Sequence, residues 1–123
     1  ADHILDKMRN LLSQVEKRVY ISCTRNYLLL LVRELEDLIR DKKKVVIITD
    51  QPASFDNAKV YVGENRGMQI GLIADSRYVL TGEYGEGSMN TCLYSGQKNF
   101  VELYKTALSN EIKLLSMREE NQQ

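Results

Sequence analysis

The five residues from Val45 to Thr49 are β-branched at every position, and the first four are apolar. A strand without a polar face has to be buried on both sides, as in the centre of a sheet that helices cover. A helical repeat precedes it, from an expected cap at Asn26 to the cations Lys42–Lys44, and Val19–Cys23 reads as an earlier strand. Strand, helix and buried strand form a βαβ unit with parallel strands and a right-handed crossover. The chain is therefore predicted to be α/β.

The remaining pattern predicts a helix at each end of the chain and four short strands between them. The first helix is expected from about residue 2 to residue 17, and the last from about Lys98 to Met117. Strands are expected at Lys59–Val62, Met68–Ala74, Tyr78–Thr81 and Met89–Tyr94, joined as a meander, with a reversal at 75–77 and a flexible loop at 82–87. The predicted fold is a mixed β-sheet flanked by helices, in the order α-β-α-β-β-β-β-β-α, forming a single domain over residues 1–123.

Composition argues against several classes of function. The chain carries 17 basic and 17 acidic residues, whereas a domain that binds nucleic acid by itself usually has an excess of basic residues. The longest apolar run, Tyr27–Val32, is too short to cross a bilayer, and no secretion leader opens the chain. Cys23 and Cys92 fall in strand patterns, as buried thiols of a reducing compartment do. We therefore expect a cytoplasmic protein that binds no membrane and needs no metal or cofactor.

Catalytic patterns are also weak. The single histidine, His3, stands at the start of the first helix without a serine or cysteine motif beside it. The glycines of the 82–87 loop lie between two strands, so they do not form a phosphate-binding turn before a helix. The acidic residues Asp75, Glu83 and Glu86 fall in turns, where solvated carboxylates are the ordinary explanation. These observations predict that the chain is not an enzyme.

The stretch from Met68 to Gly82 resembles the signature of the phospholipase D superfamily, His-x-Lys, four residues, Asp, six residues, Gly. Asp75 and Gly82 stand at the matching separation, but Met68 replaces the histidine and Ile70 the lysine. The resemblance implies a histidine nucleophile, a lysine on the phosphate and an aspartate that supports the histidine. With two of the three absent, phosphodiester chemistry by that route is not expected.

The degenerate signature is similar to the regulatory domain of TrmB-type transcription regulators, as are residues 2–8, 19–23, 45–49 and 73–82. The resemblance implies a winged-helix DNA-binding domain upstream, a small-molecule effector and a homodimer. It also implies that DNA is contacted only through the winged helix. Because Ala1 opens the chain and a helical pattern follows at once, we expect such a segment before it.

Replacing the histidine and lysine by apolar residues predicts an apolar pocket. Met68 and Ile70 would line it, with Asp75, Gly82 and Glu83 at its edge. The alternative is that Met68 and Ile70 are ordinary core residues and that no pocket exists.

Thr24 and Arg25 follow the first strand at its carboxyl end, where ligands gather in open α/β sheets. Arg25 would meet an anionic effector there, unless both residues only cap a helix or face solvent. The sequence therefore predicts an effector-sensing and dimerising domain of a TrmB-like regulator. Two alternatives stay open: a purely structural dimerisation module, or a small phosphodiesterase-like hydrolase with an unrecognised site.

Overall fold

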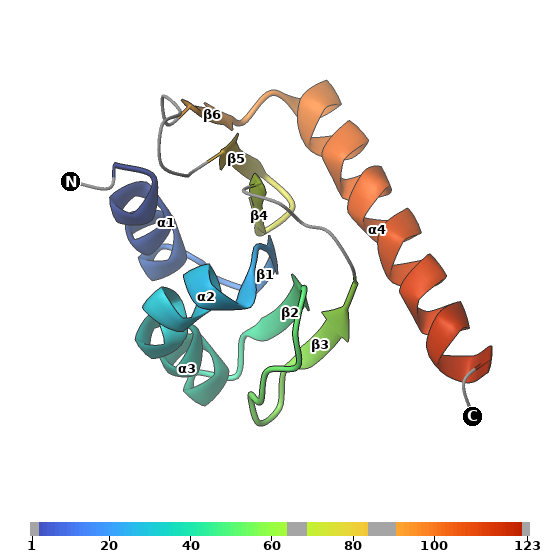
Figure 1. Ribbon diagram of the computed structural model, residues 1–123. Coiled ribbons are helices and arrows are strands. Elements are labelled where there is room, and N and C mark those ends of the chain that lie inside the picture. The colour runs from blue at the N-terminus through green and yellow to red at the C-terminus, as the bar shows by residue number, and fades with distance from the viewer. Residues whose placement is uncertain (1–2, 64–68, 84–90, 122–123) are drawn as a thin grey trace.

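The computed structural model describes residues 3–63, 69–83 and 91–121, and the side chains of His3, Ile4, Glu83, Thr91, Cys92 and 119–121 are not described. It confirms an α/β fold with a six-stranded mixed sheet between two layers of helices (Figure 1). The helices are α1 (His3–Ser13), α2 (Arg25–Leu28), the 3₁₀ turn η1 (Leu29–Leu31), α3 (Val32–Arg40) and α4 (Lys98–Asn121). The strands are β1 (Arg18–Ser22), β2 (Lys44–Thr49), β3 (Lys59–Val62), β4 (Gln69–Ala74), β5 (Tyr78–Glu83) and β6 (Thr91–Ser95).

The sheet has the order β3-β2-β1-β4-β5-β6. The predicted parallel pairing of β1 with β2 is confirmed, and β3 adds to β2 as a third parallel strand. Only β4, β5 and β6 form an antiparallel meander, so the prediction of a four-strand meander was wrong by one strand. The chain crosses from β3 at one edge to β4 beside β1, and β1 is therefore the strand where the parallel and antiparallel halves meet.

Each face of the sheet has its own apolar core, as the unbroken apolar run of β2 predicted. Val45 and Ile47 pack with the side chains of α1, α2 and α3, whereas Ile48 belongs to the core under α4. The inner residues of α4 are Val101, Leu108 and Leu115, spaced seven apart. Figure 1 shows α1, α2 and α3 on one side of the sheet and α4 alone on the other.

Two helix boundaries differ from the expected ones. The second helix is capped by Thr24 rather than Asn26, because the Thr24 hydroxyl accepts a hydrogen bond from the Tyr27 N–H at 3.4 Å. It is also divided by η1 before α3 begins. The first helix ends at Ser13 instead of residue 17, and the backbone N–H groups of residues 16–18 donate to the Asp75 carboxylate instead of to a preceding turn.

Gly71 in β4 allows α4 to sit close to the sheet. A Cβ placed on Gly71 would overlap the Tyr104 hydroxyl and lie 2.7 Å from Cζ of the same ring. Tyr104 packs against the core under α4, so its rigid ring has little room to move. The missing side chain at position 71 is therefore part of how the helix docks.

Gly71→Ala should lower the free energy of unfolding by about 1–3 kcal/mol, the usual cost of overpacking a core. In a Tyr104→Ala background the same change should cost almost nothing, because the space is then empty. Chemical denaturation of the four proteins of this double-mutant cycle measures both effects. An equal cost of Gly71→Ala in both backgrounds would contradict the contact with Tyr104.

Candidate functional site

The residues of the degenerate phospholipase D signature lie at opposite ends of β4. Ile70 is near the start of the strand, and Asp75 follows its last residue. At about 3.3 Å per residue, the five steps between them span roughly 16 Å. The pocket predicted from the sequence, with Asp75 at the edge of a cavity lined by Ile70, is therefore not the arrangement that the structure has.

Asp75 binds the loop between α1 and β1. Its Oδ1 accepts hydrogen bonds from the N–H groups of Lys17, at 2.7 Å, and Arg18, at 3.1 Å. Its Oδ2 accepts one from the N–H of Glu16 at 2.9 Å, and its own N–H donates to the Arg18 carbonyl, also at 2.9 Å. One side chain thus satisfies three backbone donors that no helix or strand uses.

The surroundings of Asp75 favour its charged form. Desolvation by partial burial raises the pKa of Asp75. The three backbone N–H groups and the Arg77 guanidinium together lower it by a larger amount, so the pKa lies below the ordinary 3.8. Asp75 and Ser76 both have φ of +56°, the left-handed region that acidic and amide side chains tolerate better than most. The tight reversal predicted at residues 75–77 is confirmed, with Asp75 as its anchor.

Ile70 lies in the core rather than in a cavity. It is 2% exposed and packs on the α1–α3 side of the sheet. The register puts it beside Gly82 of β5 and in line with Cys23, the residue after β1. The other two predicted residues here, Met68 and the side chain of Glu83, lie outside the described part of the chain.

Thr24 and Arg25 lie at the same end of the sheet as Ile70 and Gly82, as predicted from the carboxyl end of β1. The Thr24 hydroxyl caps α2, and the N–H of Arg25 donates to Oδ1 of Asp50 at 2.8 Å. Asp50 follows β2, so this bond joins the ends of the two parallel strands. The structure therefore brings four of the predicted residues to the same end of the sheet: Thr24, Arg25, Ile70 and Gly82. Asp75 lies at the opposite end.

Thr49 was not singled out from the sequence. Its side chain is fully buried at the end of β2, and its hydroxyl has no hydrogen-bond partner among the described residues. The register places it next to Cys23, on the row that continues to Ile70. The only sign of Thr49 in the sequence was that a hydroxyl side chain ends an otherwise apolar strand pattern.

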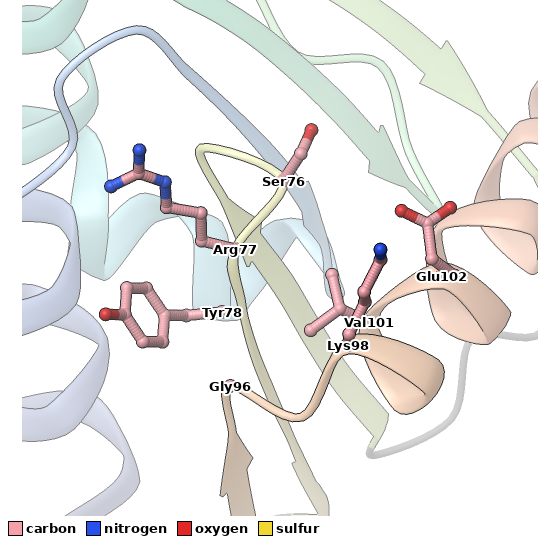
Figure 2. Close-up of a pocket in the computed structure, with 7 residues that line it drawn as sticks. All are labelled: Ser76, Arg77, Tyr78, Gly96, Lys98, Val101 and Glu102. Carbon is pink, nitrogen blue, oxygen red and sulfur yellow. The ribbon is translucent and has the colours of Figure 1, made fainter.

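A hollow of about 290 Å³ lies at the Asp75 end of the sheet, between the β4–β5 turn and the start of α4. Figure 2 shows Ser76 on the β4–β5 turn, Lys98, Val101 and Glu102 on α4, and Gly96 between them, whereas the side chains of Arg77 and Tyr78 point away from α4. The side chains that face the hollow are therefore one cation, one carboxylate and one hydroxyl, together with the apolar side chain of Val101. Sequence reasoning missed this hollow because its two walls are about twenty residues apart along the chain.

A stacked pair of tyrosines lies on the other face of the sheet, on the α1 side. The rings of Tyr78 and Tyr94 lie 5.7 Å apart and nearly parallel, and both are partly exposed. Desolvation raises the pKa of Tyr94, with a further contribution from Tyr78. Tyr94 lines a second hollow of about 270 Å³, with Leu80, the α1 residues Lys7, Asn10 and Leu11, and Gln14, which follows α1.

Comparison with known proteins identifies the fold. The sequence matches no protein family, and no curated protein has a significantly similar sequence. Among solved structures, NucT from Helicobacter pylori superposes with a TM-score of 0.70 at 16% identity, over 89% of this chain and 87% of NucT. TrmBL2, described as an archaeal chromatin protein with a novel mode of DNA binding, superposes with a TM-score of 0.74 at 11% identity, over 89% of this chain and 48% of its own.

These likenesses show that the chain has a phospholipase-D-like fold, as the signature around Asp75 and Gly82 implied. They also correct one prediction. The chain was predicted not to be an enzyme, but NucT, which shares the fold, is a phospholipase-D-like nuclease. The residues at positions 68 and 70 argue only against the histidine and lysine route, not against enzymatic activity in general. No helix among the described residues is long and apolar enough to span a membrane.

Asp75→Asn should lower the free energy of unfolding by about 1–2 kcal/mol at neutral pH, because an amide offers fewer acceptors and no charge to three backbone donors. Since the folded pKa lies below the unfolded value of 3.8, the stabilisation is complete above that value and is lost as pH falls through the folded pKa. The gap between the two proteins should therefore close in acid. Urea denaturation across the acidic range measures it.

Asp37→Asn is the matched control. Asp37 pairs with Arg40 at 3.0 Å on the exposed side of α3, where an ion pair contributes little. This variant should stay close to the parent protein at every pH. A gap for Asp75→Asn that stays constant into acid would show that the carboxylate charge is not what holds the loop.

Proposed function

We propose that this chain is the regulatory domain of a TrmB-like transcription regulator. It senses a small effector in the cytoplasm, pairs as a homodimer and leaves DNA contact to a winged-helix domain upstream. The observation that carries the proposal is the fold shared with TrmBL2 over 89% of this chain and only 48% of that protein. A domain of this size thus accounts for about half of a larger DNA-associated protein.

The charge balance supports this division of labour. Binding to DNA draws much of its affinity from basic residues that neutralise phosphates, and this chain has equal numbers of basic and acidic residues. A regulator that reads a pseudo-palindromic site also needs a two-fold partner. The role that remains for this domain is to hold two copies together and to respond to a ligand.

The hollow in Figure 2 is the effector site that we favour. Lys98 supplies positive charge, Ser76 a hydroxyl and Val101 an apolar contact, a combination suited to a small metabolite that carries a negative group. Glu102 would accept a hydrogen bond from an amino or hydroxyl group of the same ligand. Thr24, Arg25 and Gly82 remain a second candidate site at the opposite end of the sheet.

The position of the hollow suggests how a ligand acts at a distance. One wall is the turn that Asp75 ties to the loop after α1, and the other is the first turn of α4. A ligand that prefers one spacing of these walls would shift the placement of α1 relative to α4. In a homodimer, each upstream domain joined to α1 would move with it, so the distance between the two upstream domains would change.

A hydrolase is the second candidate function. The observation that favours it is coverage, since the chain matches 87% of NucT, so no large part of that fold is missing. Turnover of a generic phosphodiester by the purified chain would support it. A catalytic site would then have to use residues other than those at positions 68 and 70.

Effector binding is tested by thermal shift against a panel of anionic metabolites. We expect at least one to raise the melting temperature, because a ligand present at about 100 times its Kd stabilises by about 2.7 kcal/mol. Lys98→Ala should weaken that shift. Lys113→Ala removes an exposed cation elsewhere on α4 and should leave it unchanged.

The same panel separates the alternatives. No shift with any anionic metabolite would favour the purely structural dimerisation module. A shift that Lys98→Ala leaves intact, but Arg25→Ala abolishes, would move the effector site to the opposite end of the sheet. Retention of operator DNA by this chain alone would contradict the proposed division of labour.

A further inference from the structure

The side of α4 that faces away from the sheet carries a second stripe, apolar at every position but one. Its members are spaced alternately four and three residues apart: Leu103, Ala107, Asn110, Leu114 and Met117. Leu103 is 70% exposed, Leu114 63% and Met117 58%, the three highest values among the large apolar side chains that the structure describes. We call these five residues the outer stripe.

The outer stripe is not needed to hold α4 on the sheet. Val101, Leu108 and Leu115 already do so from another side of the helix. Figure 1 shows α4 along the outside of the molecule, with no other element beyond it. A spacing that averages 3.5 residues is the repeat by which one helix packs along another. The helix thus carries one apolar face for the sheet and another that fits a second helix.

We propose that the outer stripe joins two copies of this chain, with their α4 helices antiparallel and Leu103 of each copy against Leu114 of the other. This inference rests on the homodimer of the proposed function and gives that dimer its interface. In this register Ala107 of each copy faces Asn110 of the other, so the polar amide meets the smallest residue of the stripe.

Charge selects the antiparallel orientation. A parallel pair would bring Lys113 of each copy next to Arg118 of the other, since these positions flank the stripe five residues apart, and like charges there repel. In the antiparallel pair Lys113 lies near Thr106 of the other copy and Glu111 near Tyr104. None of these flanking contacts joins two like charges.

The size of the stripe predicts a weak dimer. Three large apolar side chains from each copy cover much less than the 1,200 Å² or so that a stable specific interface buries. We therefore expect dissociation in the micromolar range, so that concentration controls the oligomeric state. Sedimentation velocity from low to high micromolar concentration measures that equilibrium.

The decisive variants are Leu103→Lys, Leu114→Glu and the two combined in one chain. Each single change puts a charge into an apolar contact and should weaken the dimer by about tenfold or more. In the antiparallel pair the double variant sets the new lysine of each copy against the new glutamate of the other, so dimerisation should return in part. In a parallel pair like charges would meet twice, and the double variant would be the weakest.

Leu93→Lys is the control, because Leu93 is also exposed, on β6, outside the stripe. It should leave the dimer unchanged, and unaltered circular dichroism melting should show that all four variants fold. A wild-type dimer that Leu103→Lys and Leu114→Glu leave intact overturns this interface but not the proposed function. A wild-type chain that stays monomeric at high micromolar concentration overturns the homodimer as well. A double variant weaker than both single ones overturns the antiparallel register.

Discussion

The carboxylate of Asp75 is the contact on which this arrangement depends. It accepts three backbone hydrogen bonds from residues 16–18, which are 57 to 59 positions away along the chain, and so ties the turn between β4 and β5 to the loop between α1 and β1. That tie ends α1 early and fixes the start of β1, the strand where the parallel and antiparallel halves of the sheet meet. It also sets one wall of the hollow that Ser76 and Lys98 line. A charge-assisted set of bonds at one turn thus positions the first helix, the sheet and the candidate effector site together.

The degenerate signature shows how one scaffold can support different uses. Where the phospholipase D superfamily implies a lysine, this chain has Ile70, whose side chain lies in the core on the α1–α3 side. The aspartate of the signature is present, but it lies at the far end of β4 and accepts hydrogen bonds from the backbone of residues 16–18. The fold is shared with NucT and with TrmBL2 at low identity, and fold alone does not decide between catalysis and regulation. The regulatory proposal therefore rests on the charge balance and on the part of TrmBL2 that this chain matches.

The sequence predicted those features that follow from local periodicity. The apolar run of β2 predicted burial on both faces and a parallel partner, and both are present. The residues between β4 and β5 predicted a tight turn, and Asp75 and Ser76 have the positive φ that such a turn requires. What escaped prediction depends on contacts between distant segments. The partners of Asp75, the parallel pairing of β3, the fit of Tyr104 over Gly71 and the hollow beside Lys98 all join residues that no short window contains. The outer stripe was overlooked because a single helical repeat accounted for α4.

The most direct test of this account is to follow the backbone amide resonances of Glu16, Lys17 and Arg18 by NMR as the pH is lowered. Each of these N–H groups donates to Asp75, so each resonance should report the protonation of the same carboxyl group. We predict that the three titrate together, with one pKa below the ordinary 3.8 of an aspartate. Three amides that titrate separately, or at the ordinary value, would show that Asp75 does not hold this loop, and the arrangement of α1, the turn and the effector hollow would lose its foundation.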